Sequence, residues 1–162
     1  LMALIIEDGS QVVNANSYVT DAEYTAYATL KGLTVGANAT KREVELLRAM
    51  DYLQGFESSM QGTRASSTQG VSFPRYNVVL YSYLLASDFI PKELKNSQFE
   101  AAAYAHTGTL ILNEAIKNVS KERLGDLEVN YFKGGQSEKV IVKRALVYLE
   151  PLLKSFDKLV RT

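Results

Sequence analysis

Few residues in this chain have the types and the spacing that catalysis or metal binding requires. His106 is the only histidine, and it lies in an alanine-rich segment predicted to be helical, where a lone histidine is usually packed or partly exposed. Glu7 and Asp8 could contact a metal ion, but no third or fourth ligand follows at a suitable spacing. Glu43 and Glu45 are expected to be solvated charges on a helix surface. We therefore expect no acid–base pair and no metal site.

Nucleophile and cofactor motifs are missing as well. The chain contains no Cys, which excludes disulfides, thiolate zinc sites and cysteine nucleophiles. It has no phosphate-loop, dinucleotide-binding or nucleophile-elbow glycine pattern. Its apolar runs are too short to span a bilayer, so no membrane partner is expected. The sequence thus predicts a protein that is not an enzyme, uses no cofactor and works by assembling with other macromolecules.

Aromatic and basic residues carry the clearest binding chemistry. The 10 Tyr and 6 Phe residues could stack on bases, with arginine beside them. Arg64, Arg75 and Tyr76 flank a polar loop and form the best candidate cluster for DNA or a partner protein. The alternative is that most of these aromatic residues belong to the core. The 18 basic and 18 acidic residues cancel, so any attraction for nucleic acid has to come from a local patch.

Four helices are predicted to position these residues, from capping residues and from apolar side chains at helical spacing. They cover about residues 21–31, 41–54, 91–118 and a segment from Ser137 to beyond Phe156. Capping boxes at Thr20 and Thr40 begin the first two helices. The third has an alanine-rich centre, which favours a central place in the fold, and Gly108 lies inside it. Pro151 interrupts the fourth, where a kink or a restart is expected.

Short strands are expected between the helices. Residues 3–6 predict a strand or extended arm, residues 78–85 a strand or hairpin arm, and residues 127–131 a strand with alternating apolar side chains. Residues 62–70 are small and polar, which predicts a flexible loop. With no repeats, heptads or linker, the sequence predicts one domain over residues 1–162. Its expected fold is mainly α, with about four helices in a bundle and a few short β-strands or a hairpin.

Two apolar stretches exceed what the core of such a bundle obviously needs. The first is predicted to contact a neighbouring subunit through Val79, Tyr81, Tyr83 and Leu85. The second, residues 151–162, is a candidate docking segment, because an apolar stripe continues beyond the proline and needs a surface to cover it. Its candidate docking residues are Pro151, Leu152, Leu153, Phe156 and Leu159. The alternative is that this segment folds back onto its own bundle.

Several motifs, in their order and spacing, resemble those of small proteins encoded in the structural gene clusters of tailed phages. The motifs are Glu7-Asp8-Gly9, Asn14 to Val19, Arg48 to Leu53, Gly62-Thr63-Arg64, Gln69, Phe73-Pro74-Arg75, Ile90-Pro91 and Leu149 to Leu153. The resemblance covers nearly the whole chain. Residues 77–89 depart from the pattern, since they are apolar and rich in Tyr where relatives tend to be polar.

The resemblance implies a head-to-tail connector, also called an adaptor or head-completion protein, with a connector-type fold. Such proteins form rings, usually dodecamers, beneath the portal, and DNA passes through a lumen that makes only weak contacts with it. The implied partners are further copies of the chain, the phage portal protein, to which residues 151–162 would dock, and a tail or second neck protein. The implied location is the neck of the virion, after assembly in the host cytoplasm.

Members of this family are often labelled DnaT-like single-stranded-DNA-binding proteins, which is the alternative function. A connector needs subunit interfaces, whereas a single-strand binder needs a basic groove with exposed stacking aromatics. The zero net charge and the scarcity of basic runs favour the connector. A small regulatory or chaperone-type binding module is a third hypothesis.

Overall fold

Helices and short β-hairpins alternate along the chain in the computed structural model, which describes residues 3–110, 121–124, 127–130 and 142–154. The α-helices there are α1 (Asp21–Lys31), α2 (Ala39–Gln54), α3 (Lys92–Thr107) and α4 (Lys143–Leu149), with 3₁₀ turns η1 (Glu57–Ser59) and η2 (Glu150–Leu152). The antiparallel strand pairs are β1 (Thr63–Arg64) with β2 (Arg75–Tyr76), β3 (Val79–Leu80) with β4 (Tyr83–Leu84), and β5 (Lys121–Leu124) with β6 (Leu127–Asn130). None of the helices in these described ranges is long and apolar enough to cross a membrane.

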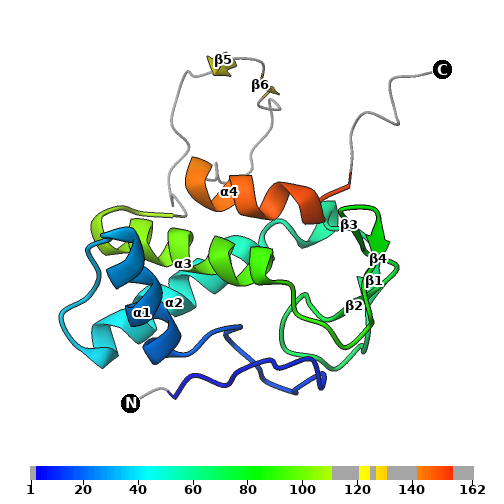
Figure 1. Ribbon diagram of the computed structural model, residues 1–162, viewed down its shortest axis with the longest axis horizontal. Helices are drawn as coiled ribbons and strands as arrows, with labels where there is room; N and C mark the ends of the chain where they lie inside the picture. The colour runs from blue at the N-terminus through cyan, green and yellow to red at the C-terminus, as the bar shows by residue number, and fades with distance from the viewer. Residues whose placement is uncertain (1–2, 111–120, 125–126, 131–141, 155–162) are drawn as a thin grey trace.

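The arrangement is mixed α/β, and the mainly α four-helix bundle expected from the sequence is wrong. Figure 1 shows the helices side by side, with β1 to β4 gathered at one end of the molecule. A bundle requires helices that pack along most of their length. The α-helical part of α4 has only 7 residues, and the stretch between α2 and α3 builds a non-helical half of the fold.

Capping residues explain where the first three helices begin and end. The capping box predicted for α1 is confirmed, since Thr20 accepts a hydrogen bond from the Glu23 amide and the Glu23 carboxylate accepts one from the Thr20 amide. The predicted box at Thr40 is wrong, because Asn38 is the N-cap of α2 and accepts from an amide of the first turn at 3.0 Å. The sequence also places Gly108 inside the third helix, but it is the extended C-cap at which α3 ends.

The expected break at Pro151 takes the form of a change of helix type. The α-helical turns of α4 end at Leu149, and Pro151 lies in the first turn of η2, where its missing N–H leaves no hydrogen bond unmade. The predicted cap of this helix, Ser137, lies outside the described residues. Residues 3–6 form an extended arm with a single isolated bridge from Ile6 to Ser17.

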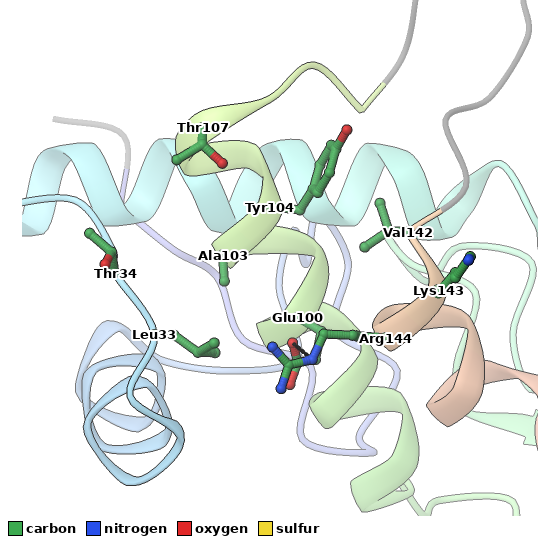
Figure 2. Close-up of a pocket in the computed structure, with 9 residues that line it drawn as sticks. All are labelled: Leu33, Thr34, Glu100, Ala103, Tyr104, Thr107, Val142, Lys143 and Arg144. Atoms are coloured by element: carbon green, nitrogen blue, oxygen red, sulfur yellow. Dashed lines mark ion pairs between the residues drawn. The ribbon is translucent and has the colours of Figure 1, made fainter.

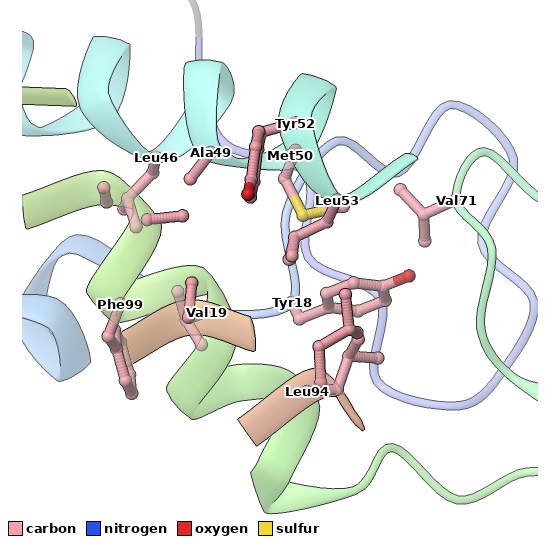
Figure 3. Close-up of a cluster of buried hydrophobic side chains, with 14 of the residues drawn as sticks. Tyr18, Val19, Leu46, Ala49, Met50, Tyr52, Leu53, Val71, Leu94 and Phe99 are labelled. Carbon is pink, nitrogen blue, oxygen red and sulfur yellow. The ribbon is translucent and has the colours of Figure 1, made fainter. Parts of the chain in front are cut away.

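The alanine-rich helix is central, as its composition predicts. α3 packs against α1, α2 and α4. Ala101 and Ala102 are fully buried, and these small side chains let the neighbouring helices approach closely. The core around them includes the fully buried side chains of Tyr18, Leu46, Leu53, Leu94 and Leu149. Figure 3 shows several of these side chains converging from α2, α3 and the N-terminal segment.

A polar side chain lies at the centre of this apolar core. Gln98 of α3 is fully buried, and its Oε1 accepts a hydrogen bond of 3.0 Å from the Tyr18 amide. Its Nε2 donates to Ser17 Oγ at 2.8 Å and to the carbonyl oxygen of Leu46 at 3.3 Å. One amide group therefore joins the N-terminal segment, α2 and α3.

We expect Gln98→Met to lower the free energy of unfolding by about 2–5 kcal/mol, since it keeps the side-chain volume but leaves buried polar groups without partners. Urea denaturation at neutral pH measures this change. A loss below about 0.5 kcal/mol, the range of an ordinary surface substitution, would contradict the prediction.

Candidate functional site

The polar loop that the sequence predicts to be flexible is ordered around one buried glutamine. Gln69 Nε2 donates hydrogen bonds to the carbonyl oxygens of Val71 (2.8 Å), Ser72 (3.2 Å) and Pro74 (3.0 Å). Its Oε1 accepts from the amide of Ser66 at 2.8 Å. A side chain that satisfies four backbone groups holds the loop in one conformation.

The candidate DNA-binding arginines lie together in the structure, and both are bound to protein atoms, Arg75 buried and Arg64 about one third exposed. Pairing of β1 with β2 places Arg64 opposite Arg75, and both guanidinium groups reach Glu57. Arg64 binds both carboxylate oxygens, through Nε and through Nη2 at 2.8 Å. Arg75 is only 6 % exposed and also donates to the carbonyl oxygens of Gln61 (2.7 Å) and Gly62 (2.8 Å). Both guanidinium groups therefore bind protein atoms in this fold.

The electrostatics of this cluster follow from its geometry. Hydrogen bonds from Arg64 hold the pKa of Glu57 below its ordinary value, and the charge of Arg75 lowers it further. Burial lowers the pKa of Arg75, and the negative charge of Glu57 offsets part of this effect by raising it. Tyr76, the third residue of the predicted cluster, lies next to Arg75 on β2 but is exposed to solvent. The structure thus separates the aromatic ring from the two charges expected to work with it.

We expect Glu57→Gln to destabilise the protein in a pH-dependent way. Because the folded pKa of Glu57 is depressed, its charge contributes stability that is present above about pH 4.5 and is lost as the pH falls further. The free energy of unfolding should drop by about 1–2 kcal/mol at pH 7, and the difference from wild type should shrink toward pH 3. Urea denaturation across this pH range provides the measurement.

Glu43→Gln on the surface of α2 is the matched control for this prediction, since the same charge is removed without a bound arginine. It should change stability little at any pH. A difference for Glu57→Gln that stays constant down to pH 3 would contradict the role given to its charge.

The adjacent acidic residues near the N-terminus form a loop rather than a metal site. Glu7 is buried, and its carboxylate accepts hydrogen bonds from the amides of Gly9 (2.9 Å), Gln11 (3.0 Å) and Val12 (2.8 Å). Asp8 accepts from the amide and the hydroxyl of Ser10. Among the residues that the structure describes, no group of three or more acidic or histidine side chains could hold a metal ion.

His106 of α3, which is exposed, and the buried Glu45 of α2 link the two helices. The sequence predicts Glu45 to be solvated, which is wrong, because its carboxylate is buried between α1, α2 and α3. One oxygen lies 2.7 Å from His106 Nδ1, and the other accepts from the hydroxyl of Tyr24 (2.9 Å) and the amide of Gly36 (3.2 Å). The partners of Glu45 account for its burial, because each carboxylate oxygen is hydrogen-bonded.

An open pocket of about 340 Å³ lies where the loop after α1 meets α3 and the start of α4. Its lining residues, drawn in Figure 2, are Leu33, Thr34, Glu100, Ala103, Tyr104, Thr107, Val142, Lys143 and Arg144. Tyr104 is 38 % exposed, the side chain of Arg144 is 68 % exposed, and Lys143 is exposed beside it. The pocket therefore combines an aromatic ring with two adjacent cations.

Neighbouring residues position the groups of this pocket. Glu100 is buried and accepts a hydrogen bond of 2.8 Å from the Tyr27 hydroxyl. Its other oxygen lies 3.5 Å from Arg144 Nε, an ion pair that holds the guanidinium beside the pocket, as Figure 2 shows. A Cβ atom at Gly108 would lie 2.7 Å from the Tyr104 ring, so glycine at this position leaves room for the ring.

The β3–β4 hairpin presents apolar side chains to solvent. Val79 and Leu84 lie opposite each other, and together with Tyr81 and Tyr83 they are 45 % to 76 % exposed. Of the residues predicted for a subunit interface, Val79, Tyr81 and Tyr83 are thus on the surface, whereas Leu85 is partly buried and packs against the core. Leu84, from the same apolar stretch, belongs to the same surface.

The candidate docking segment begins inside the chain's own fold. Leu152 is fully buried, while Pro151 and Leu153 are partly buried. The Gln61 side chain donates to the Pro151 carbonyl oxygen at 2.9 Å, and the Gln61 amide donates to that of Leu152 at 3.0 Å. Phe156 and Leu159, the other residues of this hypothesis, lie outside the described residues.

Fold and surfaces together define a small mixed α/β domain whose exposed chemistry is aromatic, apolar and locally cationic. The chain belongs to the family described as "putative DnaT-like ssDNA binding protein", whose model matches residues 2–162. No curated protein and no solved structure matches the chain. The DnaT-like part of the resemblance seen in the sequence is therefore confirmed, and the family description makes no mention of a connector.

Proposed function

We propose that this chain binds single-stranded DNA without catalysing a reaction, and that the pocket beside α4 holds one nucleotide. The observation that carries the proposal is that Tyr104, Lys143 and Arg144 line the same open pocket. Single-strand binders combine an aromatic surface for bases with cations for phosphates. The family description supports the same function.

Each group of the pocket has a role in this proposal. The Tyr104 ring stacks on a base, a contact that tolerates any base because every base has a π-face. Lys143 and Arg144 contact the phosphates, and the hydroxyls of Thr34 and Thr107 are available to the sugar or the base edge. With two phosphate contacts and zero net charge, we expect modest affinity and a shallow salt dependence.

We expect Tyr104→Ala to weaken binding of a short oligothymidylate roughly 5- to 100-fold, since stacking contributes about 1–3 kcal/mol per base. Changing Lys143 and Arg144 to Ser should reduce the slope of log affinity against log salt concentration by about 1.4. Fluorescence anisotropy over a salt series measures both effects.

Tyr76→Ala is the matched control, because Tyr76 is also exposed but lies on β2, outside the pocket lining. It should leave DNA affinity unchanged. If Tyr76→Ala weakens binding and Tyr104→Ala does not, the pocket is the wrong site. If the wild-type protein binds no oligonucleotide at low salt, the proposed function itself fails.

A structural role as a subunit of a phage head-to-tail connector is the second candidate, and we propose it on the exposed hairpin. Four uncharged side chains on β3–β4 suit a protein contact better than a phosphate backbone. In this role the chain would join the portal and a tail or second neck protein in the neck of the virion. The zero net charge suits a lumen that lets DNA pass.

Mixing the purified chain with a portal protein from the phage that encodes it tests this second role. We expect a ring-sized complex by light scattering, and no rings from the chain alone at low concentration, because closure depends on the partner. A chain that remains unassembled with every head and tail partner would contradict the connector role.

A further inference from the structure

The hairpin formed by β3 and β4 is an uncharged surface at one end of the molecule. Residues 76–87 contain no acidic or basic side chain. Val79 and Leu84 share one face of the hairpin because they are opposite in register, and both are exposed. Leu80, on the other face, is buried against the core. The outer face therefore presents aliphatic side chains that no part of the described structure covers.

The backbone at the tip of the hairpin leaves the Tyr81 side chain 67 % exposed, while its hydroxyl interacts with Glu93. Tyr81 and Ser82 form the two-residue turn with φ values of 51° and 70°, in the left-handed region. This turn type prefers Asn-Gly, and a bulky residue in that region is strained. Strained positions cluster at contact sites, where binding compensates for them. Tyr81 extends the apolar surface of Val79 and Leu84 to the tip.

The size of this surface fits a weak contact between proteins. Val79, Leu84 and the tip residue Tyr81 together expose on the order of 300–400 Å², given that a tyrosine side chain offers about 150–250 Å². Each partner in a standard protein interface contributes about 800 Å². The hairpin supplies a little under half of that area, and none of these three side chains carries a charge.

The hairpin surface is suited to contact the same surface of a second copy of the chain. The other exposed large aliphatic side chains of the described residues come from separate parts of the fold: Leu30 from α1, Val44 from α2, Val147 from α4, and Ile5 and Val13 from the N-terminal segment. An uncharged patch can meet the same patch of a second copy without like-charge repulsion or unpaired buried charge. A contact of this kind is symmetric, so each residue lies near the same residue or its register partner in the other copy.

We propose that two copies of this chain pair through their β3–β4 hairpins, face to face. The contact is centred on Val79 and Leu84, with Tyr81 at the tip. Tyr83, which lies opposite Leu80, belongs to the other face of the hairpin. It differs from the contact between neighbours in a ring, which joins two different surfaces. It is also independent of the nucleotide pocket, which lies on α3 and α4.

Sedimentation velocity over a wide concentration series, without DNA, tests the proposal. The wild-type chain should show reversible dimerisation. The double substitution Val79→Ser with Leu84→Ser should raise the dissociation constant roughly tenfold or more. Replacing Tyr81–Ser82 by Asn–Gly keeps the turn that the hairpin requires and should also weaken the dimer, which guards against loss of folding as the cause.

The chain has no cysteine, so single cysteines report which surfaces meet. Leu84→Cys and Val79→Cys should form covalent dimers on oxidation or with a short bifunctional maleimide. Leu30→Cys is the matched control, because Leu30 on α1 is 86 % exposed and lies outside the hairpin. It should cross-link only at the background rate.

Three results would overturn the proposal. A wild-type chain that stays monomeric at every concentration would show that the hairpin is either uncovered or covered by another part of the same chain. Assemblies that depend on Val79 and Leu84 but give no cross-link above the Leu30→Cys control would show a contact between different surfaces. Dimers unaffected by the hairpin substitutions would place the contact elsewhere. None of these results bears on the affinity of a single pocket for a short oligonucleotide, which is measured separately.

Discussion

Gln98 is fully buried, and both the oxygen and the nitrogen of its side-chain amide are hydrogen-bonded. The arrangement of the described core depends on these bonds. It fixes the N-terminal segment at Ser17 and Tyr18 against α2 and α3. Tyr18 then extends the link, because its hydroxyl accepts a hydrogen bond of 3.0 Å from the amide of Phe73 in the ordered loop. In the described residues no buried side-chain nitrogen or oxygen lacks a partner, so the non-helical half is held by polar contacts as much as by apolar ones.

Local signals in the sequence predicted local structure well. The Thr20 capping box and Gly32 bracket α1, and Gly55 ends α2, because the effects of such residues act within one helical turn. The bundle was a wrong expectation because tertiary hydrogen bonds decide the loop between α2 and α3. The small polar residues of this loop predict flexibility. The sequence does not show that the Gln69 side chain is buried and orders the loop.

In the candidate sites too, the sequence does not show which charged side chains become paired in the fold. Lys41-Arg42 and Lys143-Arg144 are equivalent pairs in the sequence, yet Arg42 is bound to Asp21 at 2.6 Å and 2.9 Å with little exposure, while Arg144 pairs with Glu100 at 3.5 Å and its side chain stays 68 % exposed. Arg64 and Arg75, candidates from the sequence for contact with DNA or a partner protein, are both bound to Glu57. Whether a cation is free depends on a carboxylate that the fold brings near it, and spacing along the chain does not encode that.

The pocket and the hairpin lie on different elements, and this separation has a consequence for binding. Binding of a nucleotide at Tyr104 and pairing of chains at Val79 and Leu84 use no residue in common. A paired chain would carry two pockets, each with few phosphate contacts and modest affinity. A single strand long enough to span both would bind the second pocket at a high effective concentration, and its total affinity would exceed that of either pocket. Weak pairing and weak stacking would then support each other, so a chain with no net charge could still retain single-stranded DNA.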